Sequence, residues 1–279
     1  PYTREERFFT EADLEVLDRL VELLRMGLTD MDTIVAMTRV VGQGLARIAD
    51  AEASAMKQRL TEMLEASEVG PEGAEAAAVG LAPELFPALE SFLTHVWRRH
   101  LAVALERVHI FEGADSDQRS AVGFADVVGF TRLSRHIGER ELLRIIELLD
   151  AKTQDLVSSF GGRIVKMIGD EVMFTTPDPA DAAEIALHLT EDFGADETLP
   201  DVRVGLAFGP VLSHRGDCFG PTVNLANRAA GTARPGTVLV SEDIREALTA
   251  LEGYELKAIR RRHLKGIGPT RLWTFRRRS

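Results

Sequence analysis

Apolar and polar residues follow a helical period through the first 118 residues of the chain. Apolar side chains recur every three to four positions over residues 11–26, where Thr10 is a candidate N-cap. The pattern returns over residues 30–64, where Asp30 or Asp32 can cap the helix. Residues 65–80 are rich in Gly, Ala and Glu and predict a loop or a weak helix. We expect a long helix from about residue 84 or 87 to residue 110.

The rest of the chain alternates short apolar runs with amphipathic segments. We expect strands over residues 121–128, two within 161–176 around a Gly-Asp turn, then 202–209, 237–241, and the last within 263–268 and 271–275. We expect helices over residues 139–160, 178–193, 222–231 and 242–251. This order predicts an α+β sandwich of the ferredoxin-like type preceded by an all-α domain. The expected organisation is a helical domain over 1–111, a polar linker over 112–119 and a second domain over 120–279.

Charge separates the two parts further. The chain has a net charge of −11, and residues 1–118 carry all of it, with 22 acidic and 11 basic side chains. This balance argues against nucleic acid as a partner, because polyanion binding uses a surplus of positive charge. Cys218 is the only cysteine, so no internal disulfide can form, and a reducing, cytoplasmic setting is expected. No apolar run approaches the roughly 18 residues of a membrane span. The opening residue is Pro1 rather than Met, which is consistent with truncation.

Four polar residues stand in positions suited to phosphate chemistry. Asp126 ends an apolar strand and Asp170 lies in a turn, and two Asp on neighbouring strands can hold Mg²⁺ ions. Asn224 and Arg228 are spaced i,i+4 on one helix face and can clamp a phosphate or a ribose oxygen. Taken singly, each also has an ordinary explanation, since Asp is common at strand ends and turns and the other two can be a helix-surface pair.

Three sequence blocks that follow one another along the chain help to choose between a functional and an ordinary structural role for these four residues. The blocks F-A-D-V-V-G-F-T, K-x-x-G-D-E and D-x-x-G-x-x-V-N-x-A-x-R resemble the class III nucleotidyl cyclase catalytic domain, over about residues 119–277. The chain is short between Gly209 and Asn224, as in bacterial soluble members with a reduced arm and a helical N-terminal regulatory part.

The resemblance implies an adenylyl cyclase that converts ATP to 3′,5′-cyclic AMP and pyrophosphate with two Mg²⁺ or Mn²⁺ ions. Family active sites lie at a dimer interface, so the resemblance also implies a homodimer with shared sites. It assigns metal binding to Asp126 and Asp170, and recognition of adenine to Lys166 and Asp217. It assigns support of the transition state to Asn224 and Arg228, and binding of the triphosphate to Lys265.

Two other functions compete with this one. Guanylyl cyclases resemble the same blocks with Glu in place of the Lys and Cys in place of the Asp, and Cys218 adjoins Asp217. In the family, the base-reading position lies seven residues before the Asn, so the resemblance selects Asp217 and leaves Cys218 as a small apolar side chain. A catalytically silent dimerisation module is the other alternative, but degenerate members usually lose a metal Asp or the Arg, and this chain has all three.

The helical first part has the composition of a regulatory or dimerisation module. The alternative is a helical bundle with a purely structural role. His95, His100 and His109 lie on or near its last helix, and His changes charge near physiological pH. A proton or a lipid chain is therefore a candidate regulatory ligand, although ordinary surface His and ordinary core packing explain the same residues.

Overall fold

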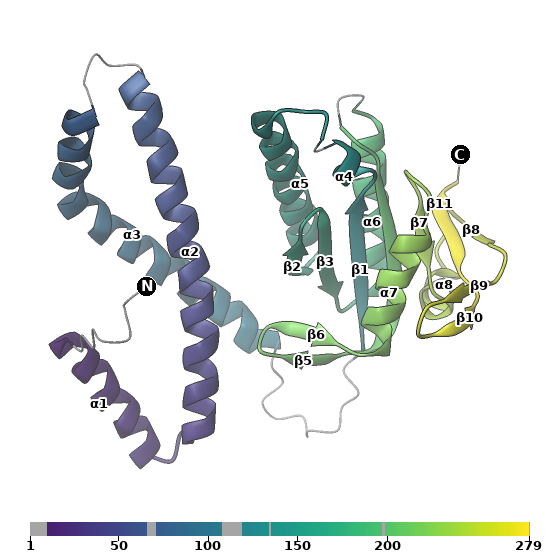
Figure 1. Ribbon diagram of the computed structural model, residues 1–279. Helices are drawn as coiled ribbons and strands as arrows, with labels where there is room; N and C mark the ends of the chain where they lie inside the picture. Colours follow the sequence, from purple (N-terminus) through teal and green to yellow (C-terminus); the bar gives the residue numbers. More distant parts are fainter. Residues whose placement is uncertain (1–9, 66–70, 108–118, 134, 197–198, 279) are drawn as a thin grey trace. The chain divides into compact units, whose positions relative to one another are not determined.

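The computed structural model describes residues 10–65, 71–107, 119–133, 135–196 and 199–278 (Figure 1). The chain divides into two compact units, Pro1–Phe111 and Glu112–Ser279. Residues 112–118 of the predicted linker lie outside the described residues, as does His109. None of the helices in the described ranges combines the length and the apolar character that crossing a bilayer requires.

Unit 1 contains three helices, α1 (Glu11–Arg25), α2 (Met31–Glu65) and α3 (Pro71–Arg107). Thr10 caps α1 as expected, because its side chain accepts from the Asp13 N–H while the Asp13 carboxylate accepts from the Thr10 N–H. Asp30 rather than Asp32 caps α2, since its Oδ1 accepts from the Thr33 N–H at 2.7 Å.

The third helix begins earlier than the sequence suggested. Residues 71–80 were expected to form a loop or a weak helix, but they are the first turns of α3. Pro71 suits the first helical position because its missing N–H would have no partner there, and the Ala and Glu residues that follow favour a helix. Pro87, one of the two predicted starting points, lies inside the helix, as does Pro83.

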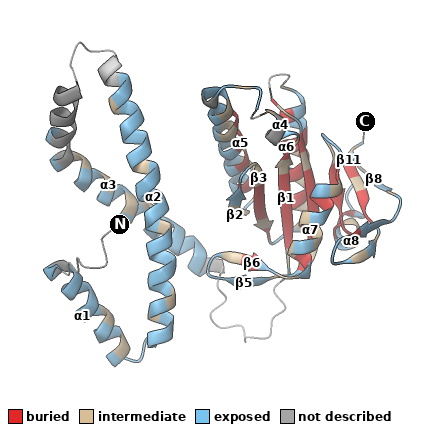
Figure 2. Cartoon of the chain, in the orientation of Figure 1, coloured by how far each residue is buried: buried red, intermediate tan, exposed pale blue. Residues whose placement is uncertain are grey.

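Unit 1 has no interior of its own among the residues whose burial is described (Figure 2). Large apolar side chains on all three helices are exposed to solvent, including Leu17, Met37, Phe92 and Trp97. Large exposed apolar surfaces are typical of interaction sites.

Unit 2 is built on a seven-stranded sheet in the order β2-β3-β1-β4-β7-β11-β8. Its first part runs β1 (Arg119–Val127), α5 (Glu139–Ser159), β2 (Arg163–Ile168), β3 (Glu171–Thr176), α6 (Pro179–Gly194) and β4 (Val202–Pro210), with a short α4 (Phe130–Leu133) after β1. This βαββαβ order with β1 between β3 and β4 is the ferredoxin-like arrangement, so the predicted fold class is confirmed. All strand pairs of this sheet are antiparallel except β4 with β7.

The second part of the unit adds α7 (Pro221–Thr232), β7 (Val238–Val240), α8 (Glu242–Leu248), β8 (Tyr254–Ala258) and β11 (Trp273–Arg277). Two small hairpins stand outside the main sheet, β5 (Leu212–His214) with β6 (Asp217–Phe219), and β9 (Arg262–Leu264) with β10 (Gly268–Thr270). The sequence pattern did not predict β8 or the β5–β6 hairpin.

The helices cover opposite faces of the sheet (Figure 1). The larger core joins α5, α6 and α8 to one face of β1 and β4, while a smaller cluster joins Ala226 and Ala230 of α7 to Val122, Phe124 and Met173 on the other. Because side chains alternate along a strand, every second residue of β1, β3 and β4 points toward α7.

Candidate active site

Two carboxylates lie at neighbouring ends of strands on the α7 face. Asp126 follows Val122 and Phe124 at the two-residue period of β1, so it belongs to the face that α7 covers. Asp170 lies in the turn between β2 and β3, where Gly169 has a φ of +65° that L side chains rarely adopt. The Val127 N–H donates to the Asp170 carbonyl oxygen at 3.3 Å, which ties the end of β1 to this turn.

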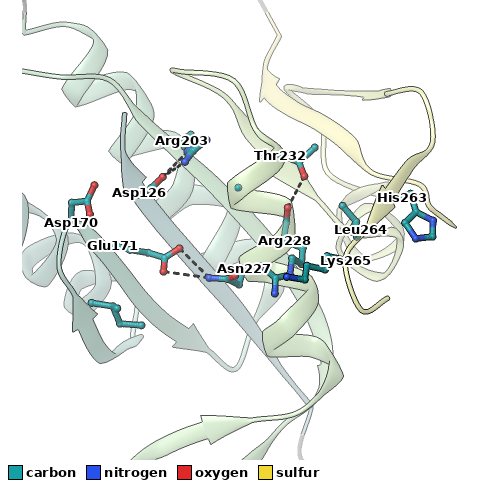
Figure 3. Close-up of a pocket in the computed structure, with 12 residues that line it drawn as sticks. Asp126, Asp170, Glu171, Arg203, Asn227, Arg228, Thr232, His263, Leu264 and Lys265 are labelled. Carbon is teal, nitrogen blue, oxygen red and sulfur yellow. Dashed lines mark hydrogen bonds and ion pairs between the residues drawn. The ribbon is translucent and has the colours of Figure 1, made fainter. Parts of the chain in front are cut away.

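An Arg residue that the sequence analysis missed faces the first of these carboxylates. Arg203 on β4 lies directly opposite Asp126 in the antiparallel register. Its Nε donates to Asp126 Oδ2 at 2.6 Å, and its Nη2 forms an ion pair with the same oxygen (Figure 3). The signal available in the sequence was a charged residue between Val202 and Val204 in an otherwise apolar strand.

A third carboxylate adjoins this pair. Glu171 is the β3 residue that pairs with Asp126, and its carboxylate accepts from Asn227 Nδ2 of α7 at 3.1 and 3.3 Å. Burial raises the pKa of Glu171 to about 7, the charges of Asp126 and Asp170 act in the same direction, and Arg203 and Asn227 oppose them. Burial, with a smaller contribution from Asp126, also raises the pKa of Asp170. Three acidic groups thus lie near one guanidinium, and burial together with their mutual repulsion raises the pKa of two of them, Asp170 and Glu171.

The helix α7 presents its polar side away from the core. Gly220, with a φ of +130°, precedes Pro221 at the first turn, which fixes where the helix begins. Ala226, Ala229 and Ala230 are buried against the sheet, whereas Asn224 and Arg228 are exposed. The predicted i,i+4 pair therefore shares the outward face of α7, as the spacing required.

One pocket of about 460 Å³ gathers several of these groups. Figure 3 shows the carboxylates on the β1 and β3 side and Arg228 and Lys265 on the side of α7 and β9. The lining residues are Asp126, Ile168, Asp170, Glu171, Arg203, Asn227, Arg228, Gly231, Thr232, His263, Leu264 and Lys265.

The position of Lys265 depends on the small β9–β10 hairpin. Leu264, the residue before it, is buried in a cluster with Ala229 and Ala233 at the end of α7 and with Leu272. This contact fixes the hairpin on α7, so that Lys265 reaches the same pocket as Arg228.

The predicted base-reading residues meet in an ion pair. Lys166 Nζ on β2 donates to both carboxylate oxygens of Asp217 on β6, at 2.8 and 2.7 Å. Burial acts to raise the pKa of Asp217, but the hydrogen bonds from Lys166 and from the Cys218 N–H outweigh it. The pKa of Asp217 is therefore lower than its ordinary value. Cys218 itself is buried in the cluster beneath α7, as expected of a small apolar side chain.

The structure thus brings the predicted residues together in two groups. Asp126, Asp170, Arg228 and Lys265 line one pocket, and Lys166 with Asp217 forms a separate pair that does not line it. Asn224 is exposed on α7 and also lies outside the lining set. A single chain therefore does not assemble all seven residues around one pocket.

Comparison with known proteins identifies the family. Residues 114–277 match the model of the adenylate and guanylate cyclase catalytic domain. An adenylate cyclase of Streptomyces coelicolor is 43% identical over 242 residues, which cover 86% of this chain and 62% of that protein. A pH-sensitive adenylate cyclase of Mycobacterium tuberculosis is 34% identical over 280 residues, which cover 95% of this chain and 68% of that protein.

Solved structures show the same fold. The catalytic core of a rhodopsin-guanylyl cyclase with converted specificity, in complex with ATPαS, superimposes with a TM-score of 0.54 at 22% identity, covering 58% of this chain and 97% of that one. The chain belongs to the family of adenylate and guanylate cyclase catalytic domains, the class III nucleotidyl cyclases. It spans about three fifths of the length of the Streptomyces coelicolor relative.

Proposed function

We propose that this chain is an adenylyl cyclase, which converts ATP to 3′,5′-cyclic AMP and pyrophosphate. The observation that carries the proposal is the set of charged groups that unit 2 presents around α7, the carboxylates of Asp126 and Asp170 and the cations of Arg228 and Lys265. Carboxylates for metal ions on one side and fixed cations on the other are what a polyphosphate substrate requires. The relatives named adenylate cyclase at 43% and 34% identity support the choice of reaction.

The acidic side of the pocket fits divalent cations. Asp126 and Asp170 offer hard oxygen ligands, and burial, which raises the pKa of Asp170, disfavours its charged form unless a cation is bound. The described residues contain no cluster of three or more His, Cys, Asp or Glu side chains that could enclose a metal. Mg²⁺ or Mn²⁺, two per site in our proposal, would be held by these two Asp and by substrate phosphates, and would supply charge neutralisation and a more acidic 3′-hydroxyl.

The side chains of this protein would position the nucleotide and stabilise the transition state. In the reaction, the ribose 3′-oxygen forms a bond to the α-phosphorus, the bond to the bridging oxygen of pyrophosphate breaks, and the 3′-hydroxyl proton is lost. Arg228 would stabilise the charge that grows on the transferring phosphoryl group, Asn224 would hold the ribose and Lys265 would bind the phosphates.

The Lys166–Asp217 pair supports adenine as the base. Its ammonium group can donate to adenine N1 and its carboxylate can accept from the N6 amino group. Guanine presents a donor at N1 and an acceptor at O6, so the same pair would oppose both groups. Because an unmatched polar group in a closed site is costly, this arrangement favours ATP over GTP.

A homodimer explains why one chain does not assemble the site. In our proposal, one protomer supplies Asp126 and Asp170, and its partner supplies the base-reading pair, Asn224, Arg228 and Lys265. A two-fold axis then creates two equivalent sites. The separation of the Lys166–Asp217 pair from the pocket and the exposure of Asn224 support this division for three of the five residues. Arg228 and Lys265 line the pocket of Asp126 and Asp170 within one chain, and the proposal assigns their catalytic contacts to the metal Asp residues of the other protomer.

We assign the helical unit a regulatory and dimerisation role. Its exposed apolar side chains and its lack of buried residues in the described part fit helices that pack against a second copy. Exposed His95 and His100 on α3 offer a site for a proton, and the relative from Mycobacterium tuberculosis is named pH-sensitive. The His95→Gln/His100→Gln double variant should shift the pH–activity curve of the full chain, and superimposable curves would remove the proton from the proposal.

Incubation of the full chain with ATP and Mg²⁺ or Mn²⁺ tests the function. We expect cyclic AMP and pyrophosphate in equal amounts, little cyclic GMP from GTP, and a loss of about 100-fold or more in Asp170→Asn. Predominant cyclic GMP would identify a guanylyl cyclase instead. A folded dimer that forms neither product would indicate a silent dimerisation module.

A further inference from the structure

The two terminal nitrogens of Arg163 contact the residues on either side of Asp217. Arg163 lies on β2, three residues before Lys166. Its Nη1 donates to the Gly216 carbonyl oxygen at 2.8 Å, and its Nη2 donates to Cys218 Sγ at 3.3 Å. One guanidinium on the Lys166 strand therefore holds the chain segment that carries the partner of Lys166.

The β5–β6 hairpin depends on such contacts for its position. Its strands are three residues each and form a sheet of their own, separate from the seven-stranded sheet. Arg215 and Gly216 connect them with φ values of +52° and +80°, the pattern of a two-residue type I′ turn. A two-stranded hairpin of this size has little stability by itself, so its anchors decide where Asp217 lies.

Besides the Lys166–Asp217 ion pair, two further contacts anchor the hairpin to the rest of unit 2. Cys218 is buried beneath α7 and fixes the inner side of β6. The Arg163 guanidinium ties the turn end of the hairpin to β2. The planar fork of Arg suits this role because its two ends can reach two acceptors at once, whereas Lys offers a single nitrogen.

We propose that Arg163 is a positioning residue for base selection, which sets the preference for ATP over GTP by holding Asp217 against Lys166. The proposal rests on the proposed function, in which these two residues read the purine. Arg163 itself makes no contact with the base in this scheme. Without its contacts, the hairpin would shift by small amounts, and the carboxylate would lose its alignment with the N6 amino group of adenine.

Initial rates of the full chain with ATP and with GTP, each over a range of concentrations, test this. For Arg163→Ala we expect the ratio of kcat/KM for ATP to that for GTP to fall about tenfold, mainly through a higher KM for ATP. Arg163→Lys keeps the charge but only one contact, so its ratio should fall about threefold. Arg144→Ala, which removes an exposed pair with Glu141 on α5, is the matched control and should keep the wild-type ratio.

Asp217→Ala separates failure of this inference from failure of the proposed function. Suppose that Asp217→Ala lowers the ATP-to-GTP ratio of kcat/KM but both Arg163 variants stay within about twofold of wild type. The positioning role of Arg163 is then wrong, and the base-reading role of Lys166 and Asp217 is retained. If Asp217→Ala leaves this ratio unchanged, both the base-reading role of Lys166 and Asp217 and the positioning role of Arg163 are contradicted. An equal loss of kcat for both nucleotides in folded Arg163→Lys, with the ratio unchanged, would show a purely structural role and overturn the proposal.

Discussion

Arg203 and Asp126 lie directly opposite each other on adjacent strands, and the guanidinium of Arg203 donates to the carboxylate that the family pattern assigns to the metal. The side chains are 31% and 16% exposed, so the pair is only partly screened by water. The Arg203 charge also acts to lower the pKa of Asp170 and of Glu171 against the effect of burial. Arg203 thus compensates part of the charge that a divalent cation would neutralise.

Replacing Arg203 should make the protein more dependent on metal ions for its stability. We expect Arg203→Gln to lower the free energy of unfolding without metal by about 1–3 kcal/mol, because the Asp126 carboxylate loses a charged hydrogen-bond donor. The increase in Tm on adding Mg²⁺ should then be larger than in the wild type, since no guanidinium competes for the carboxylate. Thermal unfolding with and without Mg²⁺ measures both effects.

The control for this experiment is Arg276→Gln, which removes an exposed ion pair with Glu255. Such a pair contributes about 0–1 kcal/mol, and its loss should not change the response to Mg²⁺. An equal or smaller Mg²⁺ effect in Arg203→Gln would show that Arg203 and the cation do not share Asp126.

Glu171 should make the stability of the metal-free protein decrease as pH rises. Its pKa is about 7 in the folded chain against an ordinary value of 4.5, so the folded state binds more protons between these pH values. Stability linked to this group is therefore fully present below about pH 4.5 and is lost as pH rises through about 7. Because Glu171 is only partly buried, solvent screening reduces the expected loss of unfolding free energy to about 1–2 kcal/mol.

The Glu171→Gln variant isolates this effect, because Gln can still accept from Asn227 but does not ionise. The difference in unfolding free energy between variant and wild type, measured with urea from pH 5 to pH 8, should grow in favour of the variant. A difference independent of pH would contradict the raised pKa.

The close approach of α7 to β4 should not tolerate a side chain at Gly205. A Cβ there would meet the Ala230 nitrogen at 2.0 Å and the Ala226 oxygen at 2.4 Å, both of which are backbone atoms of α7. Gly205→Ala must displace the helix that carries Asn224 and Arg228, so we expect about 1–3 kcal/mol less stability and a fall in kcat of at least tenfold.

Gly194→Ala is the matched control, because a Cβ at this helical residue meets no atom within 4 Å. Its stability should stay equal or rise by about 0.4–1 kcal/mol, with unchanged activity. Wild-type activity in Gly205→Ala would mean that the position of α7 does not matter for turnover. Urea unfolding and initial rates measure the two variants side by side.

Local patterns revealed the parts of the site that lie in short sequence blocks. The strand end at Asp126, the Gly-Asp turn at Asp170 and the outward face with Asn224 and Arg228 all follow from periods of two and 3.6 residues. The assignment of Lys166 and Asp217 as a base-reading pair came from the family resemblance, since 51 residues separate them and no local pattern joins them. The ion pair between them was not predicted.

Contacts set by strand register could not be found in this way. Arg203 faces Asp126 across 77 residues of chain, and only the pairing of β1 with β4 brings them together. Glu171 and Asn227 meet for the same reason, because the packing of α7 on the sheet decides which helix residue reaches β3. The start of α3 at Pro71 was missed because Gly and Pro near a helix N-terminus resemble a loop in composition.

Mixing two inactive full-length variants tests the central claim, an adenylyl cyclase whose sites are shared between protomers. Asp126→Ala lacks a metal ligand and Asn224→Ala lacks a ribose ligand, so each alone should form almost no cyclic AMP from ATP. In an equal mixture that exchanges subunits, half of the dimers are mixed and each has one intact site, so about a quarter of wild-type activity should return. A mixture that stays inactive, although size-exclusion chromatography with two distinguishable tags shows mixed dimers, would contradict the shared site.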